Sequence, residues 1–367
     1  MERGVNMLMK ISRRALLPVA VAITAALATT GASADEKVKV GFVYVGPIGD
    51  HGWSYQHHAG AEAVKQAFGD KVEVTEVENV PEGPDAERVI TQLAQTNNII
   101  FTTSFGFMNP TLKAAEQFPN VKFEHATGFK KADNMAIYNA RFYEGRHVVG
   151  LVAGKMTKSN TIGYIASFPI PEVVMGINAT YLAAKKVNPS IKLKVVWVST
   201  WFDPGKEGDA AKALIDQGAD VIMQHTDSPA AIKVAQERGV WAVGQASDMA
   251  HFGPDIVLTS IVDNWAPYYV SRVKAVMDGS WKTGDVWEGL AQGVVGVPAL
   301  NAKVPEDVQK MAMQALEDIK SGKLHPFTGP IKKQDGSDWL ADGQTAPDGD
   351  LLGMNFYVEG MEGELPK

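Results

Sequence analysis

The feature that most constrains the fold of this chain is a repeated alternation of short β-rich runs with amphipathic helical runs, which begins at Val38. The first run, VKVGFVYV (38–45), is rich in β-branched residues and apolar on both faces, as expected of a parallel strand covered by helices. Helical runs long enough to serve as crossover connections separate it from the runs that follow. The pattern therefore predicts βαβ units and parallel sheets.

The same alternation starts again at TIGYIASF (161–168), after a short polar junction at 158–160. A second series of strands and helices continues to IVLTSIV (256–262), and a later helix at 266–279 could return to the first series. The predicted fold class is α/β, with two doubly wound parallel-sheet lobes joined by a hinge. The expected division is a cleaved signal peptide (1–34), a first lobe (35–159 plus about 263–290), a second lobe (160–262 plus about 291–345) and an irregular C-terminal tail packed on the body (346–367).

Residues 1–34 have the composition of an export signal. Lys10, Arg13 and Arg14 form a basic region, an apolar run follows at 15–31, and residues 32–34 form a small-residue cleavage box. The adjacent arginines fit either the general secretory or the twin-arginine route. Cleavage after Ala34 would leave 333 of the 367 residues, with a formal net charge of −10. The expected location is the periplasm.

Composition and motifs exclude several functional classes. The chain has no cysteine, which excludes disulfides, thiolate catalysis and a lipid-modified N-terminal cysteine. An acidic balance with no basic cluster argues against binding to nucleic acid or to an anionic membrane. The sequence also lacks the motifs of nucleophile elbows, P-loops, zinc proteases and dinucleotide-binding enzymes. We therefore expect a non-catalytic, monomeric exported protein.

The loop after the first strand, GPIGDHGWSYQHHAG (46–60), is the first candidate ligand site. Ligands of open α/β sheets bind beyond the carboxyl ends of the strands, and this loop places Asp50, Trp53, Ser54 and Tyr55 there. On the functional interpretation these side chains face a ligand. The alternative is that Asp50 caps the following helix and Trp53 only packs.

A second loop of the same kind, WFDPGKEGDAA (201–211), follows a strand of the second lobe. Trp53 and one of Trp201 or Phe202 are predicted to hold a flat ligand between them; alternatively, Trp201 and Phe202 only fill the space beneath the loop. Other strand ends add the candidates Ser104, Phe105, Gln245, Asp248, Asp263 and Asn264. Carboxylates and amides with few cations suit a neutral heterocycle that donates N–H bonds.

Three histidines of the first loop, His51, His57 and His58, suggest a zinc site as a further alternative. On a helix that begins near Trp53, His57 and His58 point about 100° apart, and both cannot share a face with His51. We therefore expect no metal and no cofactor.

Taken together, the order and spacing of the motifs resemble the basic membrane protein (BMP) family of substrate-binding proteins for ABC importers, which includes purine nucleoside receptors. The resemblance covers nearly all of the chain after the signal region, including YEGRHVVGLVAGKM (143–156), WFDPGKEGDAA, GQASD (244–248) and VLTSIV (257–262). It implies a type I periplasmic-binding fold, hinge closure over a purine, and delivery to a membrane permease. It also implies that Trp53 and Trp201 stack on the base and that Asp50 matches the family's acidic loop residue, while Ser54 replaces a frequent asparagine.

Two departures from the family pattern bear on the ligand. Where nucleoside-binding members of the family hold ribose hydroxyls with an aspartate and a lysine, this chain has Ala246 and Asp263, although Asp248 matches the family's final aspartate. Losing both groups favours a free nucleobase such as adenine over a nucleoside. The alternatives are a nucleoside, a sugar, riboflavin or a signalling ligand, or a periplasmic nucleoside hydrolase that uses Asp50 or Asp263 as acid or base.

Overall fold

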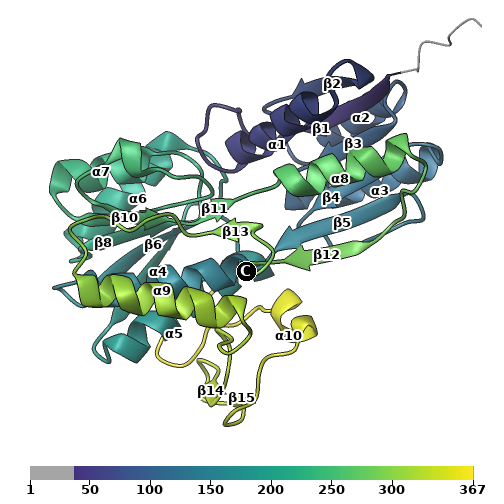
Figure 1. The fold of residues 1–367 in the computed structure, drawn as a ribbon. Coiled ribbons are helices and arrows are strands. Elements are labelled where there is room, and N and C mark those ends of the chain that lie inside the picture. Colours follow the sequence, from purple (N-terminus) through teal and green to yellow (C-terminus); the bar gives the residue numbers. More distant parts are fainter. Residues whose placement is uncertain (1–36, 367) are drawn as a thin grey trace, which may run out of the picture. The chain divides into compact units, whose positions relative to one another are not determined.

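The computed structural model describes residues 37–366, so the predicted signal peptide lies outside the described residues. Two parallel sheets organise this part of the chain (Figure 1). The first sheet has six strands in the order β12-β5-β4-β3-β1-β2, and every pairing in it is parallel. Its strands are β1 (Val38–Val43), β2 (Val72–Val77), β3 (Ile99–Thr102), β4 (Lys122–Ala126), β5 (Met135–Ala140) and β12 (Asp285–Glu288).

The second sheet has five strands in the order β10-β9-β8-β6-β7, again all parallel. Its strands are β6 (Thr161–Ala166), β7 (Lys192–Trp197), β8 (Val221–Gln224), β9 (Trp241–Gly244) and β10 (Val257–Ser260). Every residue of β3 and of β6 is buried, as expected of strands covered by helices on both faces. The predicted α/β class with two parallel-sheet lobes is therefore confirmed.

Helices connect the strands within each lobe and cover the sheets. Those of the first lobe are α1 (Trp53–Phe68), α2 (Pro84–Ala94), α3 (Met108–Gln117) and α8 (Ala266–Met277). Those of the second lobe are α4 (Phe142–Met156), α5 (Pro171–Val187), α6 (Pro204–Asp216), α7 (Ala230–Arg238) and α9 (Glu306–Lys320); α4, α6 and α7 contact strands of the second sheet, and α5 and α9 pack on α4. The principal helix pairs are α1 with α8, α2 with α3, α6 with α7, and α4 with both α5 and α9.

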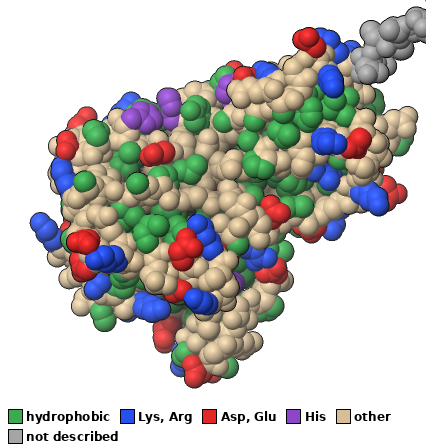
Figure 2. Space-filling model, viewed as in Figure 1, with side chains coloured by type: hydrophobic (Ala, Val, Ile, Leu, Met, Phe, Trp, Pro, Cys, Tyr) green, Lys and Arg blue, Asp and Glu red, His purple; other side chains and the backbone are tan. Residues whose placement is uncertain are grey.

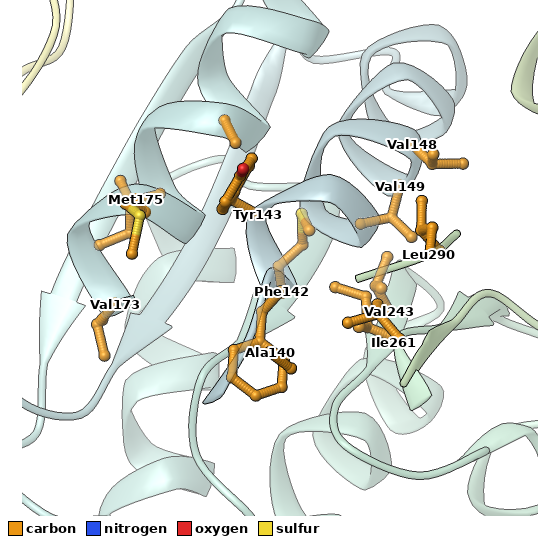
Figure 3. Close-up of a cluster of buried hydrophobic side chains, with 14 of the residues drawn as sticks. Ala140, Phe142, Tyr143, Val148, Val149, Val173, Met175, Val243, Ile261 and Leu290 are labelled. Carbon is orange, nitrogen blue, oxygen red and sulfur yellow. The ribbon is translucent and has the colours of Figure 1, made fainter. Parts of the chain in front are cut away.

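The chain first passes from one sheet to the other at Arg141, between β5 and α4. The sequence interpretation placed this boundary near residue 159, after the helix. The difference has a packing origin, because α4 carries apolar side chains nearly all round and packs closely against α5. Figure 3 shows Tyr143 of α4 on the side of Met175 of α5, whereas Val149 lies on the side of Leu290 and Ile261. Two later crossings lie at the paired strands β11 (Val262–Asp263) and β13 (Val295–Gly296), which run antiparallel to each other.

Helix α8 returns to the first lobe and is anchored there by a buried carboxylate. Glu124 of β4 accepts hydrogen bonds from Arg272 Nε (2.5 Å), the Tyr268 hydroxyl (2.6 Å) and Trp281 Nε1 (2.7 Å). Removing any one donor would leave a buried charge less well paired, which is costly. This anchor holds α8 on the first lobe, before the chain returns to the second lobe at β13 and α9.

The C-terminal segment forms the short strands β14 (Ile331–Lys332) and β15 (Asp338–Leu340) and the short helix α10 (Asp348–Leu352). Leu351 and Tyr357 are buried, whereas Leu352 is exposed. Arg141, at the first crossing, donates to both carboxylate oxygens of Asp348 (2.8 and 2.7 Å) and lies 4.1 Å from the centre of the Trp287 ring. The C-terminal segment therefore contacts the crossing directly.

Charged side chains of both signs are interspersed on the face drawn in Figure 2. On α9, for example, Lys310 pairs with Glu306 at 2.7 Å, and Lys303 just before this helix pairs with Asp255 at 2.6 Å. Such exposed pairs add little stability. Within residues 37–366, no helix combines the length and apolarity that a membrane span needs.

Candidate ligand-binding site

A cavity lies between the two lobes, at the carboxyl ends of the strands of both sheets. The first lobe contributes residues that follow β1, β3 and β4 or begin α1: Val45, Trp53, Ser104, Phe105 and Thr127. The second lobe contributes residues that follow β7, β8 and β9 or flank the start of α5: Ile170, Glu172, Trp201, His225, Asp227 and Gln245. This is where open α/β sheets place ligands.

Trp53 is the first residue of α1, and its indole is held in place from several sides. Its Nε1–H donates to the carbonyl oxygen of Thr103. The ring meets His57 edge-on at 4.4 Å between centroids and Trp265 at 5.7 Å, with interplanar angles of 78° and 76°. These contacts fix the orientation of the indole at the cavity wall.

Trp201 borders the cavity from the second lobe and has fewer contacts. Its ring lies 5.1 Å from Phe168 at an angle of 55°, and its Nε1 is buried with no hydrogen-bond partner among the described residues. Phe202 does not line this cavity. It borders a neighbouring hollow that shares Val45 and Trp201 with the first. Of the two aromatic candidates in this loop, Trp201 is thus the one that faces the cavity.

Asp50 and its neighbours shape the first loop and do not line the cavity. The buried Asp50 carboxylate accepts three backbone N–H groups, from Gly52 (2.8 Å), Ser54 (3.0 Å) and Tyr55 (3.0 Å). Burial raises the pKa of Asp50, and these hydrogen bonds oppose the rise. Ser54 is buried and its Oγ accepts from Gly46 N, whereas the Tyr55 side chain is exposed. Asp50 therefore orders the turn that leads into α1.

Asp227 joins the two lobes beside the cavity. Its Oδ1 accepts the backbone N–H of Trp53 at 3.2 Å, and its own N–H donates to the Trp201 carbonyl at 3.1 Å. Gly52 permits this approach, because a Cβ there would lie 2.8 Å from the Asp227 Cα. Burial, followed by the charges of Asp50 and Glu207, raises the pKa of Asp227 well above its usual range. Further links cross the interface from Gln56 Nε2 to the Asp263 carbonyl (2.7 Å) and from Ser247 Oγ to the His51 carbonyl.

A buried polar cluster stands behind the cavity. Arg146 of α4 donates to the Gln224 carbonyl at 2.9 Å and to Gln245 Oε1. Both carboxylate oxygens of Asp263 are buried without a hydrogen-bond partner among the described residues. Burial, reinforced by Glu172, raises the pKa of Asp263 well above its usual range, and Arg146 opposes the rise. Arg146 Nε is also buried without a partner in the described part of the chain, so the cluster contains an unpartnered donor as well as unpartnered acceptors.

The remaining candidates separate into two groups. Ser104 and Phe105 line the cavity, and Ser104 Oγ donates to Glu82 at 2.6 Å. Asp248 is exposed and accepts the N–H of Ala250 at 3.1 Å, a turn contact away from the cavity. Ala246 is buried with φ of 60°, and its carbonyl accepts the N–H of Asp263 at 2.8 Å. The two positions that depart from the family pattern are therefore adjacent.

The candidate residues did not include Glu172, His225, Asp227 or Arg146. The strand-end rule reaches the segment 225–229 after β8, which holds His225, but Glu172 lies in the first turn of α5. Asp227 lies two residues beyond His225. Arg146 lies inside a helix, where no strand-end signal applies.

The three histidines of the first loop do not converge. His57 is buried, pairs through Nδ1 with the Tyr269 hydroxyl and stacks on Trp265 at 5.0 Å. His58 Nδ1 lies 2.6 Å from Glu76, whereas His51 contacts Phe252 of the second lobe. His58, Glu62 and Glu76 could converge on an ion, but Lys65 bonds both of these glutamates (2.6 and 2.7 Å). Lys65 thus supplies the positive charge of that cluster.

Comparison with known proteins adds to this geometry. A family model described as ABC transporter substrate-binding protein PnrA-like matches residues 37–334. A purine-binding protein of Brucella abortus is 59% identical over 92% of this chain and 96% of its own length. A protein of Haloferax volcanii, named as a glucose-binding protein of an ABC transporter, is 39% identical over 92% of this chain and 83% of its own.

Solved structures show the same fold. An ABC transporter solute-binding protein from Conexibacter woesei superposes with a TM-score of 0.61 at 23% identity, covering 78% of this chain and 98% of that one. One from Aeropyrum pernix gives a TM-score of 0.68 at 19% identity, covering 81% and 93%. At these identities the likeness concerns the fold alone, and it confirms the expected periplasmic-binding architecture.

Proposed function

Because the chain belongs to the PnrA-like family of ABC transporter substrate-binding proteins, we propose that it captures a purine nucleobase, with adenine as the expected example, in the cavity between its lobes. The observation that carries the proposal is that Trp53 and Trp201 border one cavity from opposite lobes. Stacking of a base on an aromatic side chain contributes about 1–3 kcal/mol. A ligand that contacts both lobes also stabilises their closed arrangement.

The choice of a purine has two supports. The relative from Brucella abortus, which matches nearly the whole chain, is named for purine binding. The cavity also combines aromatic walls with polar groups that can pair with ring nitrogens and amines, namely Ser104, Thr127, Glu172, His225, Asp227 and Gln245. Apolar walls with a few placed polar groups are typical of small-molecule sites.

The choice of a base over a nucleoside rests on Ala246 and Asp263. The side chain of Ala246 is a buried methyl group, which cannot pair with a hydroxyl, and Asp263 stands where related nucleoside receptors have a cation. Both residues disfavour a ribose.

The test is calorimetry on protein that has been unfolded and refolded to remove any ligand carried through purification. We expect adenine to bind more tightly than adenosine, and glucose, included because of the Haloferax relative, not to bind. Tighter binding of adenosine than of adenine would contradict the argument from Ala246 and Asp263. No heat with any purine would contradict the ligand class.

Family membership implies a membrane permease as partner and a place outside the cytoplasmic membrane. We propose further that the protein is exported by its N-terminal signal, acts as a monomer and is not a hydrolase. Asp50 already accepts three backbone N–H groups and is fully buried, so it is poorly placed to activate water. Incubation with adenosine should therefore release no free base.

A further inference from the structure

Glu172 is a cavity-lining side chain with an unused hydrogen-bonding atom. It lies in the first turn of α5, is only 9% exposed, and its Oε2 has no partner among the described residues. Leaving a buried polar atom unpaired costs about 1–3 kcal/mol. A partner in the cavity would remove that cost.

The groups around Glu172 determine which of its two carboxyl oxygens accepts a hydrogen bond from the protein. Arg146 of α4, Tyr164 of β6, His225 after β8 and Asp263 of β11 are the titratable neighbours. His225 Nε2 lies 3.4 Å from Glu172 Oε1, and His225 Nδ1 lies 3.5 Å from the Tyr164 hydroxyl. Burial lowers the pKa of His225 well below its usual range, so the imidazole is neutral. We assign the Tyr164 hydroxyl as the donor to Nδ1, which places the ring proton on Nε2, on the side of Oε1.

The carboxyl itself is protonated at neutral pH. Burial raises the pKa of Glu172 to about 8, with Arg146 opposing the rise. Because Oε1 faces the N–H of His225, the proton belongs on Oε2. Glu172 therefore presents one donor, Oε2–H, beside one acceptor, the second lone pair of Oε1.

We infer that Glu172 is a specificity-determining residue, whose neutral carboxyl pairs with a purine edge carrying a ring-nitrogen acceptor next to an amine donor, as adenine does. The inference rests on the proposed function and deepens it. An ionised carboxylate would offer two acceptors and would suit an edge with two adjacent donors, such as the N–H and amine of guanine. The protonation state of Glu172 thus selects among purines.

The experiment measures adenine affinity by calorimetry between pH 6.5 and pH 9 for the wild type, Glu172→Gln and Glu172→Ala. Glutamine keeps a donor and an acceptor but does not titrate, so it is the matched control. We expect wild-type affinity to fall about tenfold from pH 7 to pH 9, as the competent protonated fraction falls. Glu172→Gln should bind within a few-fold of the wild type at pH 7 and lose this decline. Glu172→Ala should bind at least tenfold more weakly.

Titration of adenine itself is common to the wild type and Glu172→Gln, so the difference between their profiles reports on Glu172 alone. Superimposable profiles, or an alanine variant that binds like the wild type, would overturn the inference while leaving purine binding intact. If the wild type binds no purine, the proposed function fails instead. Should Glu172→Ala not fold, as checked by its thermal transition, the glutamine comparison still decides.

Discussion

Trp53 and Trp201 border the same cavity from loops that hold their indoles differently. Trp53 has its Nε1–H paired with a backbone carbonyl and its ring packed edge-on against His57 and Trp265. Trp201 contacts Phe168, and its Nε1 is unpartnered. The first lobe therefore offers a fixed surface, whereas the second offers one that can adjust to the ligand. Prior organisation of one wall reduces the entropy lost on binding.

The largest expected effect comes from removing the fixed wall. Trp53→Ala should weaken adenine binding about 100-fold, because it removes both the stacking surface and its prior orientation. Trp201→Ala should weaken it only about tenfold. Calorimetry on both variants, with thermal denaturation to check folding, makes the comparison. A larger loss for Trp201 would reverse the roles assigned to the two loops.

The next largest loss of adenine affinity is expected from a substitution at Gly52, where the two lobes approach each other closely. Gly52→Ala would place a Cβ 2.8 Å from the Asp227 backbone, and overpacking of this kind costs about 1–3 kcal/mol. Adenine affinity should fall about tenfold, although Gly52 does not line the cavity. Gly49→Ala, in the same loop with nothing within 4 Å of its added Cβ, is the control. Equal affinities in the two variants would show that this contact does not limit closure.

A smaller change in adenine affinity should distinguish the roles of the Trp53 and Trp201 indole nitrogens. Trp53→Phe keeps an aromatic ring but leaves the Thr103 carbonyl without its donor, so adenine affinity should fall about five-fold. Trp201→Phe removes a nitrogen that has no partner and should change affinity by no more than about two-fold. If Trp201→Phe is the more damaging, its Nε1–H donates to the ligand, which calorimetry with the two variants would reveal.

The smallest effect falls on stability and not on binding. Burial raises the pKa of Glu207, near the start of α6, from 4.5 to about 7. The folded state therefore holds this proton more tightly than the unfolded chain, and its contribution to stability is lost as the pH rises from about 4.5 to about 7. In Glu207→Gln the fall in Tm between pH 5 and pH 7.5 should be about 2 °C smaller than in the wild type.

Asp209→Asn, which alters an exposed carboxylate on the same helix, should leave the pH dependence of Tm unchanged. A Glu207→Gln profile parallel to that of the wild type would mean that Glu207 is ionised throughout this range. Backbone N–H groups oppose the pKa rise at both buried carboxyls: those of Asp203 and Ser228 at Glu207, and three of the first loop at Asp50.

The sequence predicted the fold well, because buried parallel strands and amphipathic helices leave periodic patterns that do not depend on distant residues. The first lobe boundary was expected near residue 159, after α4, whereas the chain passes between the two sheets at Arg141, before this helix. A helix that is apolar nearly all round can belong to either lobe, and only its packing against α5 assigns it.

The site residues were harder to predict than the fold, because the sequence does not show in which direction each loop side chain points. Strand ends led to Trp53, Ser104, Phe105, Trp201 and Gln245, which the structure places on the cavity wall, and their contact with ligand stays a prediction. The same rule could not tell that Phe202 turns into a neighbouring hollow or that Tyr55 faces solvent. The side chains of consecutive loop residues point in different directions. Hydrogen bonds such as those to Asp50 determine which of them face the cavity. Glu172 and Asp227 gain their importance from partners far away in sequence.

The contact between Arg141 and Asp348 also bears on the speed of lobe motion. Hinge residues must change their backbone torsions when lobes move. Here the side chain of the crossing residue is held by both oxygens of a carboxylate from the C-terminal segment and lies against an indole. A change of the backbone torsions at Arg141 would therefore have to move the C-terminal segment as well, or break the contact with Asp348. We expect this contact to slow such a change.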